Sequence, residues 1–432
     1  MTAPTPAFDP RAVIEGRTPG RTRVWAIVGI AAAVACGIIA LGIDMAQSVS
    51  AGDSVVPFFV ALPLALLPVP LLVAAVLFAD RLEPEPRANL AFAFVWGAGI
   101  AALFAALINT AGLEYVTQPA LGAGTGEYVS ATLGAPVVEE TLKGLVLAGL
   151  VWRRRQEIDG PTDGIIYAAM VGLGFAMIEN VGYYVNALVA PVEGGARLLG
   201  YTFVLRGVLS PLLHPIFTSM TGLGAAYAAS RRRGWWALPV GWLGAMLLHA
   251  LWNGLSVYGL PGLGVAYTIM FCVLAAIVAV LVADRRRVVR LITGWLPAYQ
   301  PTGLVTAEDI GMLSTLRGRR MARNWARGTG GLPAAAAMGD YQLAATELAL
   351  LHDKAARGVI TPDRFGRRQH DLVGLLGVAR AEFLRRRPRP PVAPWAPASG
   401  IAHTDVLPAP LPPAAPPPPP APAPAPLPPP AG

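Results

Sequence analysis

The chain is poor in charge and in cysteine for its length. Only 14% of its 432 residues are Asp, Glu, Lys or Arg, whereas 54% are hydrophobic. Because a soluble surface of this size carries more charge, the composition indicates a membrane protein. The two cysteines, Cys36 and Cys272, both lie in apolar stretches, which excludes a disulfide framework and favours a packing role for each. Lysine is equally scarce, since Lys143 and Lys354 are the only two.

Long apolar windows account for the missing charge. A helix needs about 20 mostly apolar residues to cross a hydrocarbon layer of roughly 30 Å. Windows of this kind predict an all-α, polytopic membrane bundle of about eight spans. They lie near residues 24–43, 55–78, 89–112, 129–152, 164–189, 202–229, 235–256 and 263–283.

The arginines between these windows fall on one side of the membrane. With the amino terminus inside, every cytosolic segment carries arginine, whereas the opposite loops carry only Arg197. Because Lys and Arg collect on the cytosolic side of short loops, this distribution predicts a multi-pass protein with both termini in the cytosol. The abundance of Arg, Ala, Gly and Pro is typical of GC-rich bacterial genomes, so the expected location is a bacterial inner (plasma) membrane. Orienting the spans accounts for the net charge of +8, so the basic excess requires no nucleic-acid partner.

The character of the chain changes after the last apolar window. Residues 291–386 mix polar and apolar positions with helix signals, such as Thr306 as a helix cap, and predict a small cytosolic helical domain. From residue 387 proline and alanine dominate, which favours a disordered tail without a packed core. The predicted organisation is a cytosolic N-terminal tail (1–23), a transmembrane domain (24–290), the helical domain and the Pro/Ala-rich disordered tail (387–432). The region after residue 290 could bind a cytosolic partner.

Seven ionisable residues fall well inside the apolar windows. They are Glu139, Glu140, Lys143, Glu179, Arg206, His214 and His249. Ionisable groups at membrane depth are costly and usually functional, and carboxylates and imidazoles are the groups that bind metals, activate water or relay protons. At a rise of about 1.5 Å per residue, four of these groups lie roughly 21–26 Å from the cytosolic side. These four are Glu139, Glu179, His214 and His249. Their common depth predicts that they form one shared site inside the transmembrane domain.

Each of these residues also has a purely structural interpretation. The double glutamate could form an intrahelical ion pair with Lys143, although one lysine balances only one of the two carboxylates. A histidine such as His249 is often a hydrogen-bonded packing residue, and Glu179 could hold two helices together. For Arg206, snorkelling to the outer interface is favoured over a role in binding substrate.

Ordered motifs around these residues resemble a known family. They are EETLK at 139–143, DGIIY at 163–167 running on to GFAMIEN at 174–180, LHP at 213–215 and HALWN at 249–253. In this order they resemble the PrsW family of intramembrane metalloproteases, within a wider group that includes the CAAX-processing endopeptidases and bacteriocin-immunity proteases. The similarity runs from about Asp80 to Asn253 and extends loosely to Arg290.

The resemblance implies hydrolysis of a peptide bond in a membrane-protein substrate. It carries over Glu139, Glu140, Glu179, His214 and His249 as active-site positions. The best-known role of the family is the first cut in a membrane-bound anti-sigma factor, so a regulator of that kind is one expected substrate.

Peptide hydrolysis needs an activated water, a stabiliser for the oxyanion and a proton donor for the leaving amine. Glu139 is the candidate general base, because a carboxylate in a low-dielectric site gains proton affinity. Glu140 lies about 100° around the helix from it and is expected to hold the motif through Lys143 or a neighbouring span.

Two arrangements of the remaining groups stay open. In one, Zn²⁺ is held by Glu179, His214 and His249, with water in the fourth position. In the other no metal is bound: Glu139 and Glu179 activate the water, while the two histidines and Asn253 polarise the carbonyl.

Two hypotheses from other classes compete with proteolysis. The intramembrane carboxylates and imidazoles could relay ions in a proton-coupled or ion-coupled transporter, although no convincing internal repeat is visible. Alternatively, the chain could be a non-catalytic membrane adaptor that recruits partners through residues 291–432.

Overall fold

The secondary structure is helical throughout the residues that the structure describes. The computed structural model describes residues 10–14, 22–154, 158, 160–191, 194–231 and 233–385. The prediction of an all-α fold is therefore confirmed for these residues. The predicted Pro/Ala-rich tail (387–432) and most of the predicted N-terminal tail (1–23) lie outside them.

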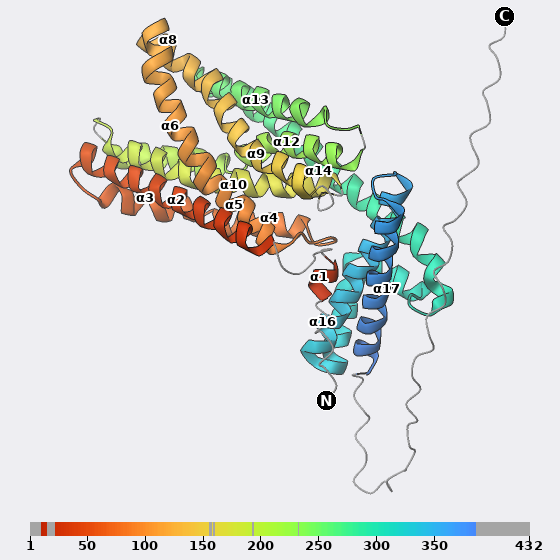
Figure 1. Cartoon of the computed structure of the whole chain (residues 1–432). Helices are drawn as coiled ribbons and strands as arrows, with labels where there is room; N and C mark the ends of the chain where they lie inside the picture. The colour runs from red at the N-terminus through yellow and green to blue at the C-terminus, as the bar shows by residue number, and fades with distance from the viewer. Residues whose placement is uncertain are drawn as a thin grey trace, which may run out of the picture. The chain divides into compact units, whose positions relative to one another are not determined.

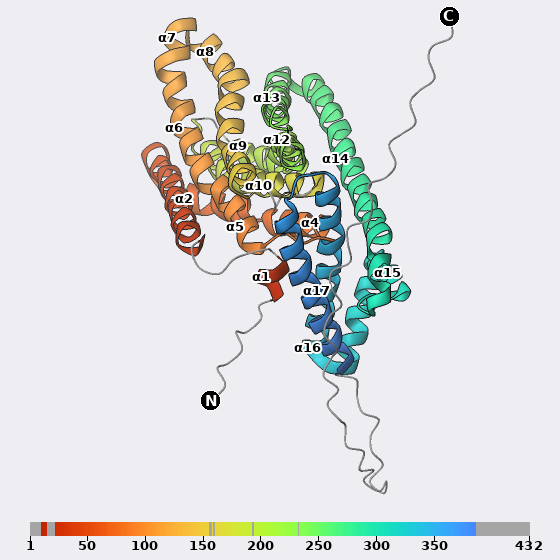
Figure 2. The same cartoon turned by 45° about the vertical axis from the view of Figure 1, so that its right-hand side comes forward.

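The helices that precede the C-terminal region run alongside one another as a bundle (Figures 1 and 2). A short α1 (Pro10–Ile14) comes first. The first half of the bundle consists of α2 (Thr22–Gly52), α3 (Val56–Leu66), α4 (Val69–Ala79), α5 (Arg87–Trp96), η1 (Gly97–Ala101), α6 (Ala102–Gly112), η2 (Leu113–Thr117), α7 (Gln118–Leu121), α8 (Ala123–Val129), η3 (Ser130–Gly134) and α9 (Ala135–Arg154). The second half consists of α10 (Pro161–Val189), α11 (Gly195–Phe203), η4 (Val204–Leu209), α12 (Leu213–Ser230), α13 (Ala237–Ser256) and α14 (Gly259–Trp295). The segments η1 to η4 are π-helical turns that continue the neighbouring α-helices.

Six helical stretches of the described residues are long and apolar enough to cross a membrane, so the chain is a multi-pass membrane protein. They are Ile27–Gly52, Val56–Ala79, Arg87–Leu121, Pro161–Val189, Gly195–Ser230 and Gly259–Thr302. The other two of the eight apolar windows in the sequence correspond to helices α9 and α13, which are less apolar than these six. They are the helices that carry Glu139, Glu140 and Lys143, and His249 and Asn253. The count of about eight spans stays a prediction.

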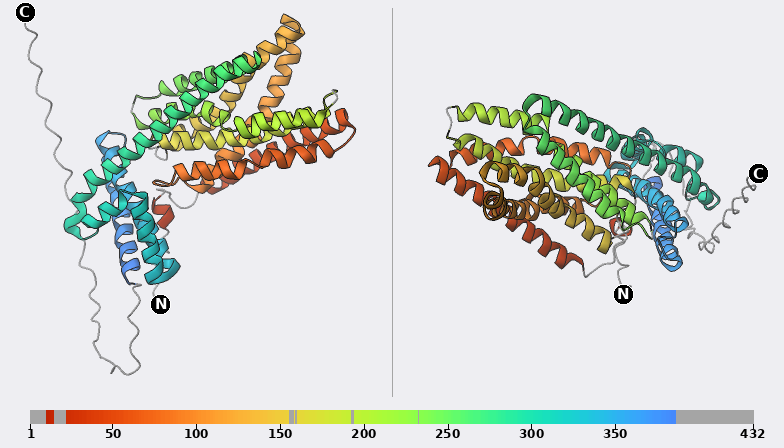
Figure 3. Two further views of the ribbon diagram at one scale, coloured as in Figure 1. Left: turned by 180° about the vertical axis from the view of Figure 1, so that it is seen from behind. Right: turned by 90° about the horizontal axis from the view of Figure 1, so that it is seen from above.

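Helix α10 lies in the interior of the bundle. Of its most apolar window, 89% is buried, against 11% for the window in α2. It packs on α12, α3, α5 and α2. Seen from behind, it runs between red and orange helices on one side and green helices on the other (Figure 3, left). Glycine permits this close packing, because a Cβ atom on Gly164 would lie 2.1 Å from the carbonyl oxygen of Gly222 on α12. Small residues at helix crossings are typical of membrane bundles.

The chain is interrupted between η4 and α12. Ser210 leaves the helical conformation (φ −128°, ψ 31°), and α12 starts at Leu213. Pro211 and Pro215 lie on either side of this start and cannot donate backbone hydrogen bonds. Non-helical backbone at membrane depth is tolerated where it is buried in protein or lines a cavity. This interruption directly precedes His214.

The region after α14 forms its own helical layer. It contains η5 (Leu296–Thr302, a 3₁₀-helix), α15 (Ala307–Leu313), α16 (Leu316–Ala356) and α17 (Pro362–Arg385). Thr306 caps α15 as the sequence predicts, since its hydroxyl accepts from the backbone N–H of Asp309. Helices α16 and α17 pack together around buried residues such as Tyr341, Leu348 and Leu372.

A buried arginine joins this layer to the loop between α4 and α5. Arg319 on α16 is 2% exposed and donates hydrogen bonds to the carbonyl oxygens of Leu82 and Leu313, each at 2.8 Å. Burial lowers its pKa to about 10. The same loop contacts α10, because the Tyr167 hydroxyl donates to Glu85 Oε2 at 2.6 Å. The loop therefore has fixed contacts on both sides.

Candidate active site

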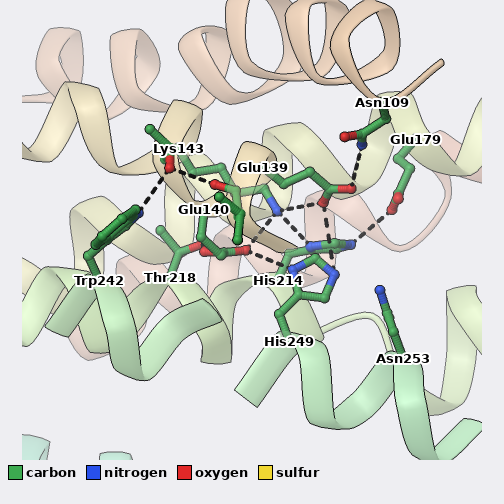
Figure 4. A network of polar contacts seen from close by, with 12 residues as sticks. Asn109, Glu139, Glu140, Lys143, Glu179, His214, Thr218, Trp242, His249 and Asn253 are labelled. Carbon is green, nitrogen blue, oxygen red and sulfur yellow. Dashed lines mark hydrogen bonds and ion pairs between the residues drawn. The ribbon is translucent and has the colours of Figure 1, made fainter. Parts of the chain in front are cut away.

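One lysine on α9 holds both glutamates of the same helix. Lys143 Nζ lies 3.1 Å from Glu139 Oε2 and 2.9 Å from Glu140 Oε1. It also lies 2.9 Å from His214 Nδ1 on α12 and 3.7 Å from the centre of the Phe175 ring on α10. The intrahelical ion pair expected as an alternative is thus present, but it continues onto a second helix (Figure 4).

Glu140 orients the histidine of α13. Its Oε1 lies 3.2 Å from His249 Nδ1, and its Oε2 accepts a hydrogen bond of 3.0 Å from Thr218. Because a carboxylate only accepts, we assign the ring proton of His249 to Nδ1. The free Nε2 then faces Glu139 Oε2 at 3.9 Å, and the ring stacks on Phe217 at 4.7 Å. Glu140 therefore supports His249 from the side that faces away from Glu139.

His214 connects α9 to the interior helix. Its Nδ1 accepts from the Lys143 ammonium, which has no lone pair, and its Nε2 lies 2.9 Å from Glu179 Oε2 on α10. The close approach of the two backbones depends on Gly172, where a Cβ atom would lie only 2.5 Å from the nitrogen of Pro215. A glycine on α10 therefore fixes how near His214 comes to Glu179.

Arg206 pairs with the same oxygen of Glu179 that His214 contacts. The guanidinium Nη2 donates to Glu179 Oε2, Nε donates to Asn180 Oδ1 at 2.7 Å, and the group lies 3.7 Å from the centre of the Tyr183 ring. The expectation that Arg206 snorkels to the outer interface is wrong, because these three contacts hold it against α10. Arg206 lies in the π-helical turn η4, and the two groups it donates to, Glu179 and Asn180, both belong to α10.

Two asparagines complete the polar contacts. Asn253 on α13 donates to the carbonyl oxygen of Ala131 in η3 at 2.8 Å. Asn109 on α6 donates to Glu139 Oε1 at 3.4 Å, and its own Oδ1 is buried without a hydrogen-bond partner in the described residues. Asn109 was not predicted from the sequence because this residue is uncharged and lies outside the four motifs. A polar amide inside the apolar window 89–112 was the available signal.

These residues surround a cavity of about 230 Å³. A water molecule occupies about 30 Å³ of liquid, so the cavity has room for water together with a peptide group. Its polar lining consists of Asn109, Glu139, Glu179, Asn180, Tyr183, Arg206, Ser210, His214, His249 and Asn253. Of the six predicted catalytic residues, five line it; Glu140 lies behind His249 instead. The non-helical residues Ser210 and Pro211 are also in the wall, where free backbone groups find partners.

Three of the residues that line the cavity could hold a metal ion. Ligand atoms of Glu139, His214 and His249 all lie within 4.8 Å of one another. Zinc bonds of about 2.0–2.2 Å would require these ligand atoms to move closer together, by up to roughly 1.4 Å. His249 also has the support that zinc-binding histidines usually have, a carboxylate on its second nitrogen. The predicted ligand set had Glu179 in place of Glu139; in the structure Glu179 contacts His214, and Glu139 completes the tight group.

Comparison with known proteins places this geometry in a family. Residues 85–282 match the model of a family described as PrsW family intramembrane metalloprotease. The chain is also 30% identical over 179 residues to the protease PrsW of Geobacillus kaustophilus (strain HTA426), an alignment that covers 41% of this chain and 70% of that relative. This chain belongs to the PrsW family. The predicted resemblance is thereby confirmed.

Membership of the PrsW family makes the chain an intramembrane protease. The matched residues 85–282 contain every polar residue that lines the cavity, from Asn109 to Asn253. Proteolysis is therefore favoured over the transporter and adaptor hypotheses. No solved structure matches the chain.

Proposed function

We propose that the protein is an endopeptidase that cuts a membrane-bound protein substrate, such as an anti-sigma factor or a similar regulator, at a peptide bond within or near the bilayer. The observation that carries the proposal is the group of Glu139, His214 and His249 at the wall of a polar cavity inside an apolar bundle. Such a cavity supplies the water that hydrolysis consumes. It also supplies polar partners for a substrate backbone that has left its helix.

Glu139 acts as the general base. One of its oxygens lies next to Lys143 and faces His249 Nε2, and the other accepts from Asn109. It takes a proton from water while the water oxygen attacks the carbonyl carbon, and the π electrons of the carbonyl move to its oxygen. When the C–N bond breaks, Glu139 returns the proton to the leaving nitrogen, so that a carboxylic acid and an amine are formed.

His214 and His249 would hold a divalent metal ion through their Nε2 atoms, with Glu179 as the third ligand. On binding the ion, His214 would release the Nε2 proton that it otherwise donates to Glu179. A bound Zn²⁺ supplies Lewis-acid polarisation of the carbonyl and lowers the pKa of its water. The chain's own residues fix the imidazoles: Glu140 orients His249, and Lys143 donates to His214 Nδ1. Glu139 lies in the same tight group as the two histidines, so it would be close enough to act on water held there.

Cleavage of single-span substrates in reconstituted lipid tests the proposal. We expect Glu139→Gln and His249→Ala to lower cleavage by about 10²–10⁴-fold, the contribution typical of general acid–base catalysis. Glu127→Gln is the matched control, because Glu127 is an exposed glutamate twelve residues earlier in the chain. Cleavage that survives both changes at the level of the control would contradict the proposal.

A further inference from the structure

In the proposed mechanism, negative charge develops on the carbonyl oxygen when water attacks, and no side chain has yet been assigned to stabilise it. Lys143, the basic residue that contacts Glu139, is unsuitable. Lys143 has three N–H donors, and its ammonium already contacts Glu139, Glu140 and His214. Its side chain is 0% exposed and does not line the cavity. Lys143 therefore has no donor to offer to a substrate.

Three amides line the cavity, and each already has a contact. Asn253 donates to the backbone of η3, Asn109 donates to Glu139, and Asn180 accepts from Arg206. The candidate that also carries a positive charge is Arg206, the one Lys or Arg among the described residues that line the cavity. Its side chain is 23% exposed, so the cavity reaches the guanidinium.

The contacts of Arg206 fix the guanidinium and leave donors over. The group has five N–H donors, and the contacts to Glu179 and Asn180 use Nη2 and Nε. The ring of Tyr183 lies 3.7 Å away and holds its plane. Glu179 Oε2 also lies 2.9 Å from His214 Nε2, so the guanidinium is one carboxylate away from the imidazole at which we place the reaction.

We propose that Arg206 is a catalytic residue that donates hydrogen bonds to the oxygen of the scissile carbonyl and stabilises the oxyanion. The inference rests on the proposed function and adds a residue to it. When water attacks, the carbonyl π electrons move onto this oxygen; they return to the carbon as the C–N bond breaks. A preorganised donor that meets developing charge contributes more to the transition state than to the bound substrate.

The local backbone agrees with this role. Arg206 lies in the π-helical turn η4, directly before the interruption at Ser210. π-Helical turns are frequent at functional sites. The interruption lines the same cavity, so a substrate strand that enters there passes close to the guanidinium.

The first test separates transition-state binding from substrate binding. We expect Arg206→Gln to lower kcat by about 10²-fold with little change in KM, and Arg206→Lys to recover part of the loss. Arg197→Gln is the matched control: Arg197 also stacks on a tyrosine, Tyr201, but lies outside the cavity lining. A loss of kcat equal to that of the control would overturn the inference.

The second test measures binding without turnover. A peptide aldehyde forms a hydrate that mimics the tetrahedral intermediate, and the parent peptide amide mimics the substrate. Arg206→Gln should weaken the aldehyde about 10²-fold and leave the amide and the metal content unchanged. Loss of metal, or equal weakening of both ligands, would show that Arg206 acts through Glu179 or the fold and would overturn the inference. If the unmodified protein cleaves no substrate at all, the proposed function fails instead.

Discussion

Two ion pairs between a glutamate and a basic residue, Glu140 with Lys143 and Glu179 with Arg206, divide the candidate site into two halves. The halves differ in how far their side chains are exposed to the cavity. The sealed half consists of Glu140, Lys143 and Thr218, and the side chains of its ion pair are 0% exposed. The open half consists of Glu179 and Arg206, whose side chains are 21% and 23% exposed. An ion pair shut away from water can only hold helices and histidines in place. An ion pair at a cavity wall can also form hydrogen bonds with a substrate that enters the cavity.

The largest expected difference between the halves is in stability. Lys143→Met leaves two carboxylates buried without their shared cation, and removing one partner of a buried pair costs about 3–5 kcal/mol. Arg206→Met should cost less, because water in the cavity still reaches Glu179. Unfolding of both variants in detergent measures the difference. Equal destabilisation would remove the distinction between a sealed and an open half.

His214 contacts both halves, and its position depends on the close packing of α12 against Gly172 on α10. A Cβ atom there would lie 2.5 Å from the Pro215 nitrogen and 2.7 Å from the carbonyl carbon of His214, so Gly172→Ala has to push α12 away from α10. A shift of about 1 Å in a catalytic group costs about 10²-fold in rate, and we expect cleavage to fall by that factor.

Gly149→Ala is the control for this prediction. Gly149 lies on α9, and a Cβ atom there would meet nothing within 4 Å. Cleavage by this variant should be unchanged. If both alanine variants cleave at the rate of the unmodified protein, the spacing of α10 and α12 does not set the geometry of His214.

A third buried carboxylate sharpens the comparison, because Asp80 lies outside the membrane-spanning segments and its Oδ1 has no hydrogen-bond partner in the described residues. Burial raises the pKa of Asp80 from 3.8 to about 7, although the backbone N–H of Glu85 lowers it. The folded protein therefore keeps a proton that the unfolded chain loses above about pH 4. The stability that Asp80 contributes is complete below that pH and is lost as the pH rises through 7.

Asp80→Asn should therefore stabilise the protein only at the higher pH. We expect the unfolding midpoint to rise by about 2–4 °C above pH 7, with no change near pH 4. Thermal unfolding at both pH values measures it. A gain of the same size at pH 4 would mean that the effect does not come from the proton on Asp80.

Much of the site was predictable from depth alone. Counting about 1.5 Å per residue from the cytosolic arginines placed Glu139, Glu179, His214 and His249 at one level, and the structure brings all four to one cavity. The count works because a membrane fixes where each span begins, so sequence position converts into depth. The all-helical fold followed from the apolar windows for the same reason.

Other features depend on tertiary contacts that no periodicity encodes. Arg206 lies in the π-helical turn η4 and donates to Glu179 and Asn180 on α10, contacts that the spacing of residues along the chain does not indicate. Asn109 joined the site only because α6 packs against α9. Which carboxylate joins the histidines also depends on how α9 and α10 approach, and side-chain spacing along one helix cannot give that distance.

The most direct test of the central claim is the metal content of the purified protein together with cleavage of a single-span substrate, measured for the unmodified chain and for Glu139→Gln, Glu179→Gln and His249→Ala. The account predicts about one divalent ion per unmodified chain. Glu139→Gln should keep the ion and lose cleavage, whereas Glu179→Gln and His249→Ala should lose both. Metal-free protein that cleaves at full rate in the presence of a chelator would contradict the metal site. If Glu139→Gln lacks the ion while Glu179→Gln retains it, Glu139 is a metal ligand and not the general base.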